Sequence, residues 1–189
     1  MKNNNHHSTK TIVLTALLAA LTVAGSTLRI TIPVDIAGTT SFHLGNIMCA
    51  LSGILLGPWY GAAAAGIGSA IYDMLNPLYI SEAWITFLTK GCYGLAAGLV
   101  IRFGRKEWGY GKATLATVAG ALTYALLYLG KTYFYSGMLL KGLTAQAAAM
   151  TVVTKLPATT FNAVIAIVCA PALAIAVRKA LERNHMKIS

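Results

Sequence analysis

Three lysines inside apolar segments are the residues of this chain best suited to chemistry. Lys90, Lys131 and Lys155 each lie in a long hydrophobic run. An ionised side chain at the centre of a bilayer costs at least ~2.5 kcal/mol, so it is found mainly where it binds a partner or lines a polar cavity. Ammonium groups form strong hydrogen bonds with anionic oxygens. The lysines therefore predict a shared cavity for an anionic or carbonyl-rich ligand. The alternative is that they snorkel to the outer headgroups, which Lys131 fits best.

Helical spacing places further polar and aromatic side chains beside these lysines. One polar face recurs at intervals of 4, 4 and 3 residues and consists of Thr151, Lys155, Thr159 and Asn162. A second face recurs at intervals of 4, 3 and 4 residues and consists of Tyr124, Tyr128, Lys131 and Tyr135. Residues at such intervals share one side of an α-helix. Aromatic walls with a few convergent polar groups are typical of small-molecule sites.

We expect these faces, with the segment around Lys90, to form a substrate-binding site. Lys90, Lys155 and Asn162 are predicted to bind the polar end of the ligand. Tyr128 and Trp84 are predicted to pack on its apolar part. The full set of candidate substrate-binding residues is Lys90, Lys155, Asn162, Tyr128, Trp84, Lys131, Thr159, Tyr93 and Asn46.

Catalytic and metal-binding motifs are missing from the sequence. It contains no Walker-type phosphate loop, no HExxH and no GxSxG. Its three cysteines, Cys49, Cys92 and Cys169, are far apart and form no CxxC pair, so neither a disulfide framework nor a zinc site is indicated. We therefore expect a protein that is not an enzyme and that holds no metal or cofactor.

The composition indicates an integral membrane protein. Of the 189 residues, 57% are hydrophobic and 11% are charged, whereas soluble domains carry about 25% charged residues. A spanning helix needs about 20 apolar residues. We predict an all-α bundle of six transmembrane helices, with a single membrane domain at 11–180 between a tail at 1–10 and a basic tail at 181–189. The predicted spans are 11–28, 43–57, 58–75, 81–103, 113–135 and 147–177.

The connections between the spans are predicted from their turn-forming residues. Residues 29–42 mix Pro33, Gly38 and hydroxyl side chains, which favours a loop. Gly57-Pro58 is predicted to be a tight break, with the proline opening the next helix. A second loop is predicted at 136–146.

The distribution of basic residues predicts the orientation in the membrane. The formal net charge is +10. Ten of the fifteen lysines and arginines lie in the two tails and in the segment around 102–112. Basic residues concentrate on the cytoplasmic side, so both termini are predicted to be cytoplasmic. The three buried lysines then lie in the outer half of the membrane. A nucleic-acid partner is not expected.

Small residues repeat along one side of the first span. Ala16, Ala20 and Ala24 recur at every fourth position. Small side chains at this interval let helices approach closely in lipid. We expect this stripe to dock another subunit; the alternative is packing within the chain.

These features together resemble the substrate-binding S component of an energy-coupling factor (ECF) vitamin transporter. The alanine stripe is similar to the AxxxA motif of that family. Residues 42–91 resemble its second to fourth helices, including an LGP-x-x-G turn at 56–61 and the segment GIGSAIYD at 66–73. The resemblance implies a six-helix bundle that binds a vitamin at its outer end, lined by the last three helices and covered by the loop between the first two. It also implies that Ala16, Ala20 and Ala24 contact a transmembrane scaffold subunit.

The resemblance implies a function in import. The chain would be the high-affinity substrate-binding subunit of an ATP-driven importer in a prokaryotic plasma membrane. Its partners would be the scaffold protein and two cytoplasmic ATPases. The substrate would be a pantothenate-, riboflavin- or pyridoxine-type vitamin, and the excess of lysine favours an anionic one. The alternatives are a self-contained carrier or channel and, less favoured, a small membrane enzyme.

Overall fold

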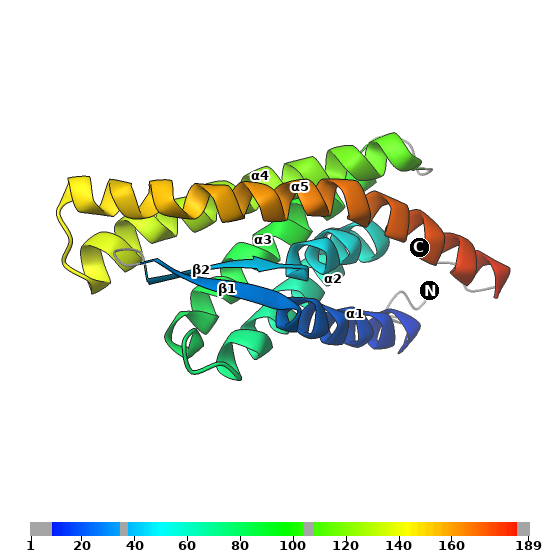
Figure 1. Ribbon diagram of the computed structural model, residues 1–189. Helices are drawn as coiled ribbons and strands as arrows, with labels where there is room; N and C mark the ends of the chain where they lie inside the picture. The colour runs from blue at the N-terminus through cyan, green and yellow to red at the C-terminus, as the bar shows by residue number, and fades with distance from the viewer. Residues whose placement is uncertain (1–8, 35–37, 104–107, 185–189) are drawn as a thin grey trace, which may run out of the picture.

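Five long apolar helices form most of the protein. The computed structural model describes residues 9–34, 38–103 and 108–184. Each of the five helices in these residues is long and apolar enough to cross a membrane. They are α1 (Thr9–Thr27), α2 (Gly45–Met74), α3 (Ala83–Arg102), α4 (Tyr110–Lys131) and α5 (Ala145–Arg183), as labelled in Figure 1. The structure thus supports an all-α membrane protein.

Helix α2 reverses its direction at Gly57. This residue has φ 77° and ψ −170°, a backbone conformation that glycine adopts at little steric cost, and Pro58 follows it. The two halves then lie side by side, because Cys49 Sγ and Ser69 Oγ are 3.8 Å apart. On a straight helix these residues would be about 30 Å apart. The predicted break is confirmed, and the predicted bundle of six separate helices is present as five helices, one of which folds back.

Glycines allow α3 to approach both halves of α2 at backbone distance. A Cβ at Gly94 would lie 2.5 Å from the carbonyl oxygen of Gly61, and a Cβ at Gly98 would overlap the backbone of Gly57 and Pro58. Among the helix pairs, α2 and α3 share the most extensive interface. The small residues of these helices are therefore used for packing within the chain.

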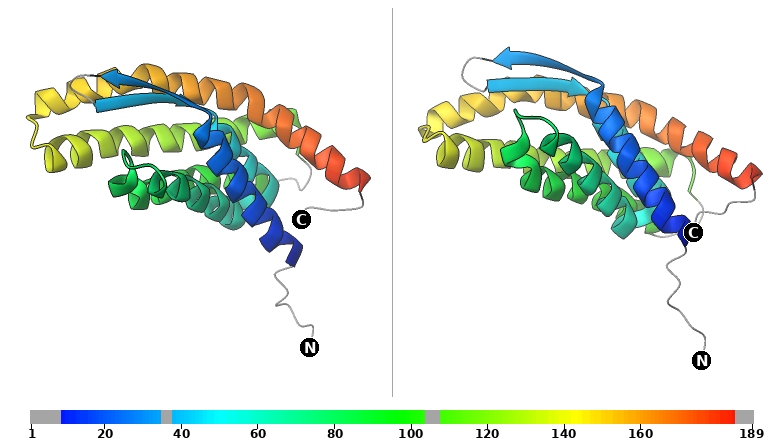
Figure 2. Two further views of the ribbon diagram at one scale, coloured as in Figure 1. Left: turned by 60° about the horizontal axis from the view of Figure 1, so that its bottom comes forward. Right: turned by 90° about the horizontal axis from the view of Figure 1, so that it is seen from below.

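The predicted loop at 29–42 is instead a β-hairpin. Strands β1 (Arg29–Val34) and β2 (Gly38–His43) pair antiparallel, with Arg29 opposite His43 and Val34 opposite Gly38. The prediction was wrong because β-branched residues favour strands, and their pairing here outweighs the proline and glycine. Both views in Figure 2 show the hairpin running alongside α5.

The predicted loop at 136–146 is mostly helical. A π-helical segment, η2 (Thr132–Leu140), continues α4 and leaves only residues 141–144 as the connection to α5. A short 3₁₀ turn, η1 (Ile80–Glu82), precedes α3. In Figure 1, η2 lies at the left, whereas the first turn of α1 and the last turn of α5 lie at the right. The strands extend toward the η2 end, which we call the hairpin end.

Candidate functional site

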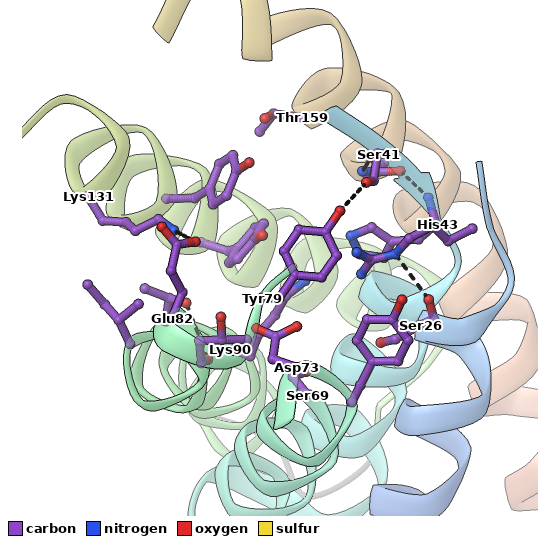
Figure 3. Close-up of a pocket in the computed structure, with 18 of the residues that line it drawn as sticks. Ser26, Ser41, His43, Ser69, Asp73, Tyr79, Glu82, Lys90, Lys131 and Thr159 are labelled. Atoms are coloured by element: carbon purple, nitrogen blue, oxygen red, sulfur yellow. Dashed lines mark hydrogen bonds and ion pairs between the residues drawn. The ribbon is translucent and has the colours of Figure 1, made fainter. Parts of the chain in front are cut away.

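A cavity of about 360 Å³ lies at the hairpin end of the bundle. Its lining comes from the end of α1, from the hairpin, from the end of α2 and the segment after it, and from α3, α4 and α5. Figure 3 shows these side chains converging from separate elements. The volume falls in the range of small-molecule sites, roughly 300–1,000 Å³.

Asn162 attaches the hairpin to α5. Its Oδ1 accepts the backbone N–H of His43 at 2.9 Å, and its Nδ2 donates to the carbonyl oxygen of Ser41 at 2.9 Å. The rings of Phe42 and Phe161 add an edge-on contact at 5.0 Å. Asn162 lines the cavity as predicted, but its amide is bonded to the backbone of β2. These bonds give Asn162 a role in positioning the hairpin, and its contact with the polar end of the ligand stays a prediction.

The hairpin is also attached to the segment that follows α2. The guanidinium of Arg29 lies 4.4 Å from the ring centroid of Tyr72 and 4.8 Å from that of Tyr79. The hydroxyls of Ser41 and Tyr79 are 3.3 Å apart, a contact marked in Figure 3. Contacts on both sides thus hold the hairpin over the cavity.

Lys90 is the buried cation of the cavity. Its side chain is 5% exposed; its Nζ donates to Oδ1 of Asn46 and lies 3.9 Å from the ring centroid of Tyr124. The structure therefore places two of the candidate site residues, Lys90 and Asn46, in contact. Asn46 is buried behind Lys90 and does not line the cavity.

Three tyrosines form a row beside Lys90. The ring centroids of Tyr93 and Tyr124 are 6.0 Å apart, and those of Tyr124 and Tyr128 are 5.5 Å apart with nearly parallel planes. Tyr124 and Tyr128 line the cavity. Tyr93 is fully buried and does not belong to the lining of the cavity. It supports the aromatic wall instead.

An ion pair joins α4 to the start of α3. The ammonium of Lys131 pairs with Glu82, which also accepts a hydrogen bond from Ser136 at 2.9 Å. The Lys131 side chain is only 11% exposed. Lys131 therefore lines the cavity and pairs with Glu82, which favours the cavity prediction over snorkelling for this residue.

Lys155 and Thr159 line the cavity from α5, as predicted. The Nζ atoms of Lys131 and Lys155 lie 5.7 and 5.9 Å from the ring centroid of Tyr128. The Thr159 hydroxyl donates to the carbonyl oxygen of Lys155 at 2.9 Å. Lysines from two helices thus converge on one aromatic ring.

Trp84 lies outside the cavity. It is 54% exposed and makes an edge-on contact with Tyr135 at 5.6 Å. Trp84 precedes Lys90 by six residues, which is about 240° around a helix of 3.6 residues per turn. Trp84 therefore does not line this cavity, and its contact with the ligand stays a prediction.

Several residues that line the cavity were not predicted from the sequence to do so. They come from the hairpin and from the end of α2, and include Arg29, Ser41, His43, Tyr72 and Asp73. A prediction of strands over 29–43 would have placed every second side chain on the same face, and so together on one side of the hairpin. With Arg29 and Asp73 added, four cations and two carboxylates line the cavity, so the excess of positive charge is retained.

The alanine stripe of α1 lies on the outer surface of the bundle. Ala16, Ala20 and Ala24 are all exposed, whereas the neighbouring Leu18 and Ala19 are buried. The stripe therefore does not pack within the chain and is available to a partner.

Comparison with known families identifies the chain. Residues 6–179 match the family described as the ECF-type riboflavin transporter, S component. The chain belongs to this family. It is thus an S component of the ECF transporters and a multi-pass membrane protein, and its family is not a catalytic one.

The chain is also similar in sequence to two other proteins and in fold to a solved structure. The S component is 35% identical over 118 residues to an uncharacterized protein from Pyrococcus woesei, covering 62% of this chain and 74% of that one. It is 36% identical over 106 residues to a UPF0397 protein from Streptococcus thermophilus, covering 56% of this chain and 52% of the relative. The chain thus spans about half the length of the latter. A crystal structure of the S component for biotin from an ECF-type ABC transporter has the same fold, with a TM-score of 0.61 and 14% identity over 91% of this chain and 94% of that one.

Proposed function

We propose that this S component captures a small vitamin-type molecule in the cavity at its hairpin end and presents it for ATP-driven import. The observation that carries the proposal is the cavity itself. Side chains from six parts of the fold converge on it, and the hairpin is fixed along it by hydrogen bonds to α5 and to Tyr79. A cavity lined by aromatic rings and a few charged groups suits one small polar molecule.

The hairpin end would face the outside of the cell. Basic residues are concentrated toward the opposite end, where Lys10, Arg102, Lys112, Arg178 and Arg183 lie near the termini of the helices. Cytoplasmic segments of membrane proteins carry such an excess. The plasma membrane of a prokaryote is the expected location, with both termini in the cytoplasm.

The substrate is proposed to be an anionic vitamin or a related micronutrient. Arg29, Lys90, Lys131 and Lys155 outnumber the two carboxylates in the lining. The pantothenate type fits this charge better than the riboflavin or pyridoxine types. The tyrosine wall would pack on the less polar part of the molecule.

A transmembrane scaffold subunit and two ATPase subunits are the proposed partners. The exposed stripe of Ala16, Ala20 and Ala24 offers α1 a surface for close approach to another helix. The chain would then supply binding specificity, and its partners would supply energy.

Mass spectrometry of small molecules extracted from the purified chain tests the proposed function. We expect one vitamin-sized compound in stoichiometric amount, and co-purification of ATPase subunits from native membranes. Uptake of that compound into liposomes that contain this chain alone would contradict the proposal and favour a self-contained carrier.

A further inference from the structure

His43 is held in one orientation at the inner end of the hairpin. Its Nδ1 accepts the backbone N–H of Gly45 at 3.2 Å. Gly45 begins α2, and the first N–H groups of a helix have no partner within it. The backbone N–H of His43 itself donates to Asn162. The ring is therefore fixed against the start of α2 while its strand is fixed to α5.

The ring is packed closely at this position. A Cβ at Gly45 would lie 3.0 Å from Nδ1 of His43 and 2.5 Å from Oγ of Ser26. Only a residue without a side chain leaves room for both the imidazole and the serine. Glycine at position 45 therefore lets the imidazole ring pack directly against the start of α2.

The hydrogen bond to Gly45 defines which ring nitrogen carries the proton. A nitrogen that accepts a hydrogen bond has no proton, so a neutral imidazole here is protonated on Nε2. Burial lowers the pKa of His43 well below its ordinary value, and the charges of Lys90 and Arg29 lower it further. The positive end of the α2 dipole acts in the same direction. His43 is therefore neutral at pH 7 and has one N–H to donate.

The neighbours of His43 give the inner end of the cavity an excess of donors. Arg29 is its cross-strand partner, and Arg29, His43 and Lys90 all line the cavity. Within the described parts of the chain, no residue accepts a hydrogen bond from Nε2 of His43. Lys90 has three N–H groups, of which Asn46 takes one. These donors can therefore bind an acceptor from outside the chain.

One carboxylate of the protein lies among these donors. Asp73 also lines the cavity and accepts a hydrogen bond from the Thr86 side chain. It balances one of the two cations, Arg29 and Lys90. One positive charge then remains, which a singly charged anion would neutralise.

We propose that His43 Nε2 and Lys90 Nζ together bind a carboxylate of the substrate. This assignment rests on the proposed function and names the chemical class of its ligand. A carboxylate accepts through two oxygens and donates nothing, so it matches one neutral and one charged donor. Because His43 belongs to the hairpin and Lys90 to α3, the same group would connect the cover of the cavity to its wall. The site would then select an acid over its uncharged amide or alcohol.

Matched pairs of acids and uncharged analogues test this assignment. The full chain in nanodiscs is titrated with biotin and biotinamide, pantothenate and pantothenol, and nicotinate and nicotinamide, with riboflavin as an uncharged reference. We expect an acid to bind at least 10-fold more tightly than its analogue. For that acid, His43→Phe should raise the Kd roughly 10- to 100-fold, which corresponds to one hydrogen bond to a charged group. His43→Gln, which keeps an N–H donor, should recover most of the affinity.

The control is Ile30→Val on the same hairpin, because Ile30 is 69% exposed and does not line the cavity. It should leave the Kd unchanged. Equal binding of acid and analogue, or an unchanged Kd in His43→Phe, would overturn the assignment. Failure of all six paired compounds to bind would overturn the carboxylate class, whereas the extracted compound would still decide the proposed function. Tight binding of riboflavin, with no binding of the acids, would likewise overturn the carboxylate class but not the proposed function.

Nitrogen NMR of histidine-labelled protein gives a readout independent of affinity. The chain has four histidines, and His43→Gln identifies the signal of His43. We expect the neutral Nε2–H form at pH 7 and a shift of the Nε2 signal when the bound acid is added. An imidazolium, an Nδ1–H form or an unchanged Nε2 signal would contradict the proposal.

Discussion

The side-chain amide of Asn162 donates to the backbone carbonyl of Ser41 at 2.9 Å, across 121 positions of the sequence. The Oδ1 atom of the same side chain accepts the backbone N–H of His43. One helical side chain thus satisfies two backbone groups of β2, as a neighbouring strand would. These two hydrogen bonds do not depend on the side chain of Ser41, which contacts the Tyr79 hydroxyl separately.

Asn162→Leu should release the hairpin. Two buried hydrogen bonds contribute roughly 0.5–1.5 kcal/mol each, so amide exchange in residues 38–43 should become about 10-fold faster or more. Hydrogen-exchange mass spectrometry measures this directly. Asn184→Leu is the matched control, because Asn184 is exposed and its side chain donates to the Ala180 carbonyl oxygen of its own helix. Unchanged exchange in Asn162→Leu would show that the other contacts of the hairpin hold it without these two hydrogen bonds.

Lys131 and Glu82 should behave as a coupled pair. Removing one partner of a poorly solvated ion pair leaves an uncompensated charge, so Lys131→Met should destabilise the protein by about 3 kcal/mol. The double variant Lys131→Met/Glu82→Gln should recover much of this loss. Thermal unfolding of the four proteins of the cycle measures the coupling. Additive effects would mean that the two side chains do not interact in the membrane.

Lys155 should contribute directly to ligand affinity. A charge-assisted hydrogen bond contributes roughly 1.5–3 kcal/mol, so Lys155→Met should weaken binding by about 10- to 100-fold. Calorimetry with the compound extracted from the purified chain provides the measurement. Lys141→Met is the control, since Lys141 is exposed and does not line the cavity. Equal small effects in both variants would remove Lys155 from the binding site.

Gly98→Ala should destabilise the fold. Its Cβ would overlap the backbone at the turn of α2, and backbone there has little room to move. Overpacking of this kind costs about 1–3 kcal/mol. Gly91→Ala is the matched control in the same helix, because its Cβ would meet only the Ala62 carbonyl oxygen, at 3.6 Å. A similar unfolding temperature for both variants would contradict the close approach of α2 and α3.

Ala20→Trp should abolish uptake while ligand binding by the isolated chain stays intact. Ala20 is exposed at the centre of the alanine stripe, and a bulky side chain would prevent close helix contact. Uptake assays and co-purification with the scaffold subunit measure the effect. Leu21→Trp, exposed about 100° further around α1, is the control. Loss of ligand binding with complex assembly retained would contradict the docking assignment.

The sequence alone was sufficient for features that depend on neighbouring residues. The apolar segments predicted membrane helices, because a bilayer imposes both a minimum length and internal hydrogen bonding. Gly57-Pro58 predicted the reversal of α2. The intervals from Thr151 to Asn162 predicted the face of α5 that lines the cavity, because helical periodicity is a local property.

Only the tertiary structure decided how the site is completed. The pairing of β1 with β2 converted an expected loop into a cover and brought Arg29 and His43 to the cavity. Lys131 pairs with Glu82, 49 positions away in the sequence, and Asn162 accepts a hydrogen bond from His43, 119 positions away. Trp84 was directed outward by its angular position on α3. These outcomes depend on how helices are placed against one another, and helical spacing specifies the face of each helix but not the neighbour that the face meets.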